Sequence, residues 1–243
     1  MDFKRLHNFR DLGGYRAADG RRVQWGMLYR SDSLAKLEYG STDWNSFAAL
    51  GIRTVIDLRY PSEVLEAGRV PDYEGLAYHN HSIEHRPSDQ AAQDPETDPV
   101  DYLGRHYGHI VEDGVEELRG VLAAILEADS APLVFHCVSG KDRTGIVAAL
   151  VLSLLGVSDE DIAEDFALTS LATEHFVAEF HTTHPDRELR WPAYGTAPKE
   201  LMRRFLADIA RDYGTMRGYA EVRLGIDGEA VDALRERFLA TPQ

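Results

Sequence analysis

The sequence contains few of the groups that would build disulfides or metal centres. Cys137 is the only cysteine among 243 residues, so no internal disulfide can form. No cysteine and histidine pattern typical of a zinc site is present. His175, His181 and His184 do not share one helix face, and no carboxylate completes a ligand set with them. We therefore expect neither a metal ion nor another cofactor.

Long apolar runs and positive charge are also scarce. No run approaches the roughly 20 residues that a membrane-spanning helix needs, and the start of the chain has no apolar signal core. We expect a cytoplasmic protein without stable membrane insertion, with export without a cleaved signal left open. The formal net charge of -15 disfavours nucleic-acid binding, because a polyanion would be repelled at long range. Any anionic ligand must be held by a local group of positive charges.

The remaining composition is that of a globular chain. Its hydrophobic content of 44% can form a substantial core, and no linker or internal repeat appears, so we expect one domain over residues 1–243. Apolar patterns predict strands over residues 52–58, 76–83 and 133–136. Helices are predicted over residues 115–128, 146–155, from Ser158 onward, and over residues 229–239. Strands separated by helices indicate an α/β fold with a central, mostly parallel sheet flanked by helices.

The most informative stretch begins next to the lone cysteine and reads His-Cys-Val-Ser-Gly-Lys-Asp-Arg-Thr-Gly from His136 to Gly145. It lies between a predicted strand and a predicted helix. Backbone N–H groups at a helix start have no internal partner and lie at the positive end of the helix dipole, so such a loop can surround a phosphate. The same field stabilises a thiolate, which is a competent nucleophile toward phosphorus.

Arg143 completes a C-x-x-x-x-x-R spacing that brings a guanidinium beside the thiolate. Its planar fork can hold two phosphoryl oxygens into the transition state. Thr144 is suited to donate its hydroxyl to the sulfur, and Gly140 and Gly145 permit close backbone approach. An isolated cysteine is more often a small buried hydrophobe, but the accompanying arginine, threonine and glycines argue against that interpretation here. A nucleotide-triphosphate loop is disfavoured because the earlier glycine is missing and no Ser or Thr directly follows the lysine.

This motif resembles the active-site loop of cysteine-dependent protein tyrosine phosphatases, in the atypical bacterial branch related to the mycobacterial and Listeria phosphatases. Asn8 to Tyr15, which reads Asn-Phe-Arg-Asp-Leu-Gly-Gly-Tyr, is similar to the amino-terminal signature of that branch. Segments 26–31 and 55–59 and the region around Tyr213 are also similar. The resemblance implies a tyrosine-phosphatase fold with the phosphate loop at a strand-to-helix turn. It also implies Cys137 and Arg143 as catalytic residues and a substrate-binding set of Val138, Ser139, Gly140, Lys141 and Thr144.

The general acid that protonates the leaving oxygen is not fixed by the motif. Classical family members carry it in a Trp-Pro-Asp loop, whereas Trp191-Pro192-Ala193 has alanine at the decisive position and suits an insertion or helix break. In related proteins an aspartate after a strand such as 76–83 is the proposed acid, and Glu84, which lies nearest to that position here, departs from the family by being a glutamate. The catalytic candidates are therefore Glu84 first, then Asp142 and Asp89, with Asp94 and Asp98 also considered.

Several polar residues keep a structural alternative. Arg10, Arg30 and Arg59 either add to the phosphate field or form structural ion pairs. Asp142 either acts as an acid or positions water, or else braces Arg10, Arg30 or the loop backbone. His136 is expected to be buried and to orient the loop through hydrogen bonds. Residues 170–215 are a candidate for a gating region near the pocket.

Together these features predict a phosphomonoester hydrolase with a cysteinyl-phosphate intermediate. The expected substrates are phosphotyrosine and, further, phosphoserine, phosphothreonine or phosphoinositides, for which Lys141 would supply an extra cation. A phosphatase of a small phosphorylated nucleoside or sugar and a non-catalytic phosphate-binding module remain open. The oligomeric state is not predicted.

Overall fold

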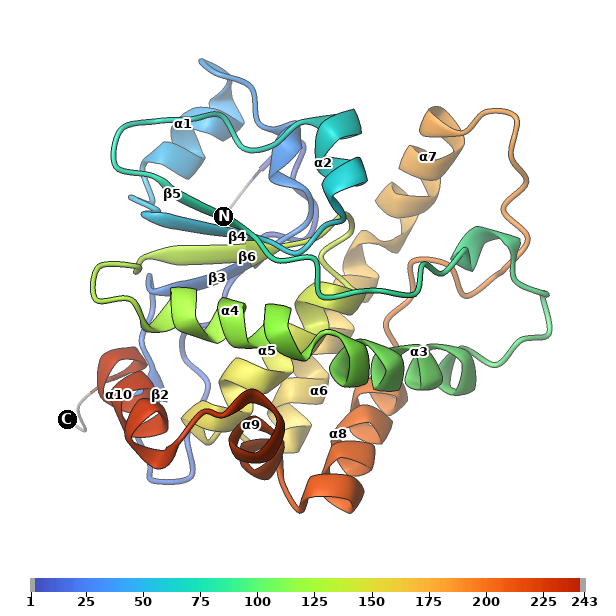
Figure 1. Ribbon diagram of the computed structural model, residues 1–243. Coiled ribbons are helices and arrows are strands. Elements are labelled where there is room, and N and C mark those ends of the chain that lie inside the picture. Colours follow the sequence, from blue (N-terminus) through green and yellow to red (C-terminus); the bar gives the residue numbers. More distant parts are fainter. Residues whose placement is uncertain (1–2, 241–243) are drawn as a thin grey trace.

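The computed structural model describes residues 3–240, and its centre is a five-stranded sheet in the order β1-β3-β6-β4-β5 (Figure 1). The strands are β1 (Arg10–Asp11), β3 (Leu28–Ser31), β4 (Thr54–Asp57), β5 (Ala77–Asn80) and β6 (Leu133–His136). The inner pairs β3–β6, β6–β4 and β4–β5 are parallel, and β1 joins the edge antiparallel. A separate two-stranded ribbon joins β2 (Arg22–Val23) to β7 (Leu239–Ala240). The predicted α/β fold with a mostly parallel sheet is confirmed.

Helices flank this sheet on both faces (Figure 1). The α-helices are α1 (Thr42–Ala48), α2 (Pro61–Ala67), α3 (Pro99–Asp113), α4 (Val115–Leu126), α5 (Asp142–Leu155), α6 (Asp159–Ala167), α7 (Thr173–Thr183), α8 (Lys199–Tyr213), α9 (Met216–Leu224) and α10 (Gly228–Phe238). Three short 3-10 segments lie at Leu34–Lys36, Gln90–Ala92 and Leu168–Ala172. None of the helices in residues 3–240 combines the length and apolar character needed to cross a membrane.

Strand β6 explains why residues 133–136 are uniformly apolar up to the histidine. It is paired on both sides and buried at every position, so side chains on both faces enter a core. Val134 packs into the smaller cluster with α1, whereas Leu133 and Phe135 join the larger cluster formed with α3 to α6 and α8 to α10. The alternation of a strand thus assigns neighbouring residues to opposite layers.

The register of the central strands determines where polar groups gather. Ser31, His136 and Asp57 lie side by side at the carboxyl ends of β3, β6 and β4. All three are buried. In parallel sheets this edge is where ligands usually bind, because the strand ends open toward the loops that follow them.

The boundaries differ from the sequence predictions mainly at helix and strand ends. Strands expected over residues 52–58 and 76–83 span Thr54–Asp57 and Ala77–Asn80, and the helix expected over 115–128 ends at Leu126. Helix α5 begins four residues before the apolar run that predicted it, at Asp142. Its first turn is built by the phosphate-loop motif itself, which carries no apolar periodicity.

Two long segments, 81–98 and 184–198, lie against each other beside α3. Trp191 is buried and donates through Nε1 to the Thr97 carbonyl at 2.9 Å, and Arg190 N donates to the Ala91 carbonyl at 2.9 Å. Arg187 pairs with Asp89 at 2.7 Å. The Trp191-Pro192-Ala193 segment therefore lies in the connection between α7 and α8, and the buried Trp191 anchors that connection to residues 81–98.

Candidate active site

The predicted strand, loop and helix around Cys137 are present as β6, residues 137–141 and α5. Cys137 follows the last residue of the central strand and is only 2% exposed. Arg143 and Thr144 lie in the first turn of α5, so the loop doubles back between the strand end and the helix start.

The carbonyl groups of this loop are held by donors outside it. Ser33 N donates to the Val138 carbonyl at 2.8 Å, and Asn8 Nδ2 donates to the carbonyls of Ser139 and Gly140 at 2.9 and 3.0 Å. His136 Nδ1 lies 3.1 Å from the Cys137 carbonyl. A peptide unit directs its C=O and N–H to opposite sides, so this arrangement turns the loop amides toward the opposite side, away from those donors.

The amide groups of the loop, unlike its carbonyls, have no hydrogen-bond partners among the described residues. The backbone N–H groups of residues 138–143 donate to no acceptor within residues 3–240. Successive free amides at a helix start form a concave anion site. Gly140 is required for this shape, because its φ of +67° favours glycine and a Cβ would lie 2.4 Å from the Ser31 carbonyl oxygen.

Asp165 on α6 supports the loop from behind through two arginines. Its carboxylate accepts from Arg10 Nε at 2.8 Å and from Arg30 Nη1 at 2.6 Å, and Arg30 Nη2 donates to the Gly140 carbonyl at 2.8 Å. Burial opposes its charge, but Arg10 and Arg30 outweigh burial and lower the pKa of Asp165 to about 2. The two arginines are therefore structural, and the suggestion that Asp142 braces them is wrong.

Arg59 is also structural. It forms an ion pair with Asp57 at 2.6 Å and donates to the Gly68 carbonyl at 2.8 Å. Asp57 Oδ2 lies 3.5 Å from His136 Nε2. Burial lowers the pKa of His136 more strongly than Asp57 raises it, so the ring is neutral and suited to orienting the loop.

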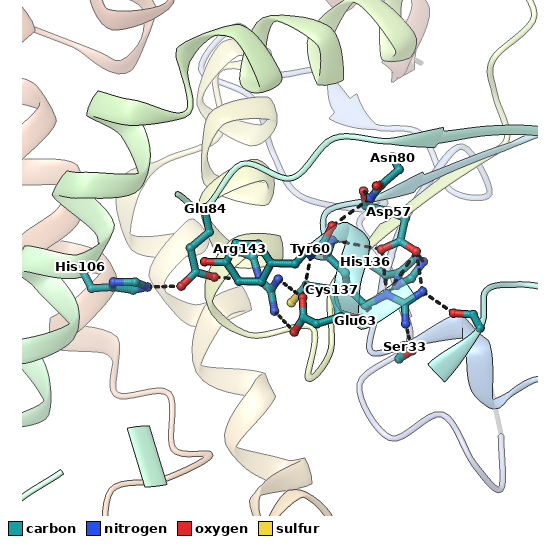
Figure 2. A network of polar contacts seen from close by, with 12 residues as sticks. Ser33, Asp57, Tyr60, Glu63, Asn80, Glu84, His106, His136, Cys137 and Arg143 are labelled. Atoms are coloured by element: carbon teal, nitrogen blue, oxygen red, sulfur yellow. Dashed lines mark hydrogen bonds and ion pairs between the residues drawn. The ribbon is translucent and has the colours of Figure 1, made fainter. Parts of the chain in front are cut away.

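Arg143 is held by two carboxylates from different segments (Figure 2). Its Nη1 and Nη2 atoms donate to Glu63 at 2.6 and 3.0 Å, and its Nε lies 3.3 Å from Glu84 Oε2. The ring of Tyr60 lies 5.3 Å from the guanidinium carbon. Burial opposes its charge, but Glu63, Cys137 and Glu84 together raise the pKa of Arg143. Arg143 is thus a fixed cation beside the cysteine.

Glu84 connects Arg143 to helix α3. Its second oxygen, Oε1, lies 2.9 Å from His106 Nε2, and both side chains are 9% exposed. The three residues form a line of contacts from α3 through the segment after β5 to the first turn of α5 (Figure 2). Glu84 is the first candidate for the general acid on sequence grounds, and its carboxylate contacts the Arg143 guanidinium.

Asp142 is held on the other side of the loop. Tyr107 Oη donates to its Oδ1 at 2.7 Å, Gln90 Nε2 donates to its Oδ2 at 3.0 Å, and Lys141 Nζ lies 3.6 Å from the same oxygen. Burial opposes its charge, but Lys141, Gln90 and Tyr107 outweigh burial and lower the pKa of Asp142. Asp142 is a carboxylate whose acceptor sites are engaged.

The predicted substrate-binding residues differ in their placement. Val138 is 43% exposed, whereas the Lys141 side chain is 2% exposed and donates to Gln90 Oε1 at 3.1 Å. The predicted bond from Thr144 to the sulfur is absent: Thr144 Oγ1 is buried and has no partner among the described residues. The amides of residues 139–141 belong to the peptide units whose carbonyls Ser33 and Asn8 hold, so they are the loop amides whose direction is fixed.

The other acid candidates serve local structure. Asp98 caps α3 by accepting from Asp101 N, Asp94 closes a turn at Glu96 N, and Asp89 pairs with Arg187. Within residues 3–240, no three His, Cys, Asp or Glu side chains are grouped as they would be to hold a metal ion.

Three of the residues that build the site are missing from the sequence analysis: Glu63, Asp165 and His106. Glu63 had a local signal, because Tyr60-Pro61-Ser62-Glu63 has proline at the helix start and the capping-box glutamate, which accepts from Tyr60 N at 2.7 Å. Asp165 and His106 had none, since their partners are far away in the sequence and each lies on an otherwise ordinary amphipathic helix.

Comparison with known proteins identifies the family of the chain. A model of the tyrosine phosphatase family matches residues 1–240. H16_A0669, a predicted tyrosine-protein phosphatase of Cupriavidus necator, is 28% identical, with 99% of this chain and 88% of the relative covered. The triple specificity protein phosphatase PtpB of Mycobacterium tuberculosis is 28% identical, with 65% of each chain covered. The crystal structure of P. aeruginosa TpbA with pTyr matches at 16% identity and a TM-score of 0.38, covering 89% of this chain and 88% of TpbA. The chain belongs to the tyrosine phosphatase family and is a cysteine-dependent phosphatase.

Proposed function

We propose that Cys137 attacks the phosphorus of a phosphomonoester and that water then hydrolyses the resulting cysteinyl phosphate. The observation that carries this proposal is the orientation of the loop, whose carbonyls are held from outside while the amides of residues 138–143 have no acceptor among the described residues. Fixed amides stabilise phosphoryl oxygens as charge moves toward them in the transition state. No reorganisation of the loop is then needed during the reaction.

Arg143 supplies the charge opposite the equatorial oxygens. Glu63 holds the Nη1 and Nη2 edge of the guanidinium, and Glu84 contacts Nε. A bound phosphate dianion competes with Glu84 for Nε, while Glu63 keeps the guanidinium in position. This division between a permanent and an exchangeable partner supports a role for Arg143 in both binding and transition-state stabilisation.

We assign the general acid to Glu84 rather than Asp142. Lys141 and the hydrogen bonds from Gln90 and Tyr107 favour the ionised form of Asp142, which then has no proton to donate. Glu84 faces the exchangeable edge of Arg143, beside the position that a bound phosphate would take. In the first step the S–P bond forms, the ester P–O bond breaks, and the leaving oxygen takes the Glu84 proton. In the second step the carboxylate takes a proton from the attacking water, and the thiolate leaves.

We propose phosphotyrosine in proteins as the substrate. Cys137 is 2% exposed, and an aryl phosphate reaches a deep nucleophile more easily than the shorter phosphoserine. Lys141 is engaged by Gln90 and Asp142, so its charge is less suited to a polyanionic inositol head group than its position in the motif suggested. We also propose a cytoplasmic location, because a reducing compartment preserves a catalytic thiol.

The test compares wild type, Cys137→Ser and Arg143→Lys on p-nitrophenyl phosphate and on matched phosphotyrosine and phosphoserine peptides. We expect no turnover by Cys137→Ser and a fall in kcat of at least about a hundredfold for Arg143→Lys, because a point charge cannot replace the planar fork. Arg203→Lys at an exposed surface pair is the matched control. Acid-quenched wild type should carry a phosphoryl group on the Cys137 peptide. Turnover by Cys137→Ser, or phosphoserine preferred over phosphotyrosine, overturns the corresponding part of the proposal.

A further inference from the structure

Helix α3 contacts two of the carboxylates considered for the general acid, through the adjacent residues His106 and Tyr107. His106 contacts Glu84 at 2.9 Å, and Tyr107 donates to Asp142 at 2.7 Å. Both residues are buried.

The two pairs differ in what happens when a phosphate enters. Asp142 has three partners, Tyr107, Gln90 and Lys141, and it has no contact with Arg143. Glu84 has two, and one of them is Nε of Arg143, which the phosphate competes for. Once a phosphate takes Nε of Arg143, the contact with His106 is the ion-pair contact of Glu84 that remains, and the neutral Tyr60 side chain is its other polar neighbour.

We propose that His106 is the positioning residue of Glu84: it holds Oε1, keeps Oε2 toward the leaving oxygen, and stabilises the carboxylate formed when the proton is transferred. This inference rests on the proposed function and assigns a role to a residue that does not touch substrate. The polar groups that face this pair are Asp142 beside His106, and Arg143 and Tyr60 beside Glu84. Burial and then the charge of Glu84 raise the pKa of Tyr60, so Tyr60 stays a neutral phenol and brings no positive charge to Glu84.

The consequence is a dependence on the leaving group. Protonation matters for an alkoxide or phenoxide that leaves reluctantly and matters little for nitrophenoxide, because the benefit of a general acid follows the basicity of the leaving oxygen. Loss of His106 should therefore slow phenyl phosphate and phosphotyrosine peptide more than p-nitrophenyl phosphate. A residue that merely stabilises the fold would slow all of them alike.

The experiment measures kcat of His106→Ala and His106→Gln with phenyl phosphate and p-nitrophenyl phosphate. We expect His106→Ala to lower kcat at least about tenfold on phenyl phosphate and less than about twofold on p-nitrophenyl phosphate. His106→Gln, which retains an N–H donor, should recover part of the loss. The matched control is His109→Gln on the same helix, since His109 lines the groove between α3 and α8, away from Glu84.

A second arm uses Glu84→Gln. If His106 acts through Glu84, adding His106→Gln to Glu84→Gln should not lower kcat further. Equal losses on both substrates, or an additional loss in the Glu84→Gln background, overturn the role of His106 even when wild type forms the Cys137 phosphoryl adduct. Absence of that adduct in wild type instead overturns the proposed function, so the two failures are distinguishable. Thermal melting of each variant identifies a loss caused by unfolding, and His106→Gln then carries the comparison.

Discussion

Replacing Asp165 by asparagine tests whether the support behind the phosphate loop is as strong as its contacts indicate. The carboxylate accepts from Arg10 and Arg30 at 2.8 and 2.6 Å and is buried. Its pKa of about 2 lies almost two pH units below the ordinary value of 3.8, which corresponds to about 2 kcal/mol of stability near neutral pH. Asparagine also leaves two arginines close together without an anion, so we expect a total loss nearer about 3 kcal/mol.

Urea unfolding of wild type and Asp165→Asn measures this loss, and its pH dependence tests the cause. Because the folded-state pKa is depressed, the contribution is fully present above about pH 4 and disappears as pH falls toward 2. The stability gap between the two proteins should therefore narrow over that interval. Asp159→Asn, an exposed change at the start of the same helix, should cost less than about 1 kcal/mol.

The reasoning is refuted if Asp165→Asn unfolds at the same urea concentration as Asp159→Asn, or if its deficit is unchanged between pH 4 and pH 2. Activity gives a second measurement at neutral pH. Arg30 holds the Gly140 carbonyl, so loosening Arg30 should lower kcat for p-nitrophenyl phosphate in protein that is still folded.

Two further changes act at the loop and at its arginine. Gly140→Ala should abolish phosphate binding, because the new Cβ would lie 2.4 Å from the Ser31 carbonyl oxygen and the backbone has a φ of +67°. Protection by phosphate against thermal unfolding measures this binding. A variant that binds phosphate as wild type does would contradict the need for glycine. Glu63→Gln should lower kcat roughly tenfold, because one of two charge-assisted bonds to Arg143 is replaced by an opposed amide. Steady-state kinetics would compare Glu63→Gln with Glu66→Gln, an exposed change on the same helix. Equal activity of the two variants would refute the role given to Glu63.

Local patterns predicted much of the fold because they act over a few residues. The strand at Leu133–His136 was predicted with its exact bounds, since its apolar run is short and bounded by Pro132 and the loop motif. The start of α5 was missed because the first turn follows from loop geometry and not from apolar spacing.

The site divides in the same way. The loop residues were predicted because they are consecutive, and Glu84 was predicted as the acid because related proteins have an aspartate after the corresponding strand. The residues that support the loop from behind could not be predicted. Asp165 is 155 residues from Arg10, and the role of Asp165 depends on how α6 packs. The environment of Lys141 was equally inaccessible: whether its amino group faces substrate or protein depends on Gln90, which comes from a separate segment.

The hydrogen bond from Asn8 to the Gly140 carbonyl joins residues 132 positions apart. Strand β6 and helix α5 are neighbours in the chain and can approach each other early, but the loop between them is shaped by a segment near the opposite end of that long span. Contacts of such separation form late, because closing the intervening chain costs entropy that only the packed sheet offsets. The phosphate cradle is therefore completed only when the amino-terminal residues dock, and a chain that has the motif but lacks that docking has the nucleophile without its binding site.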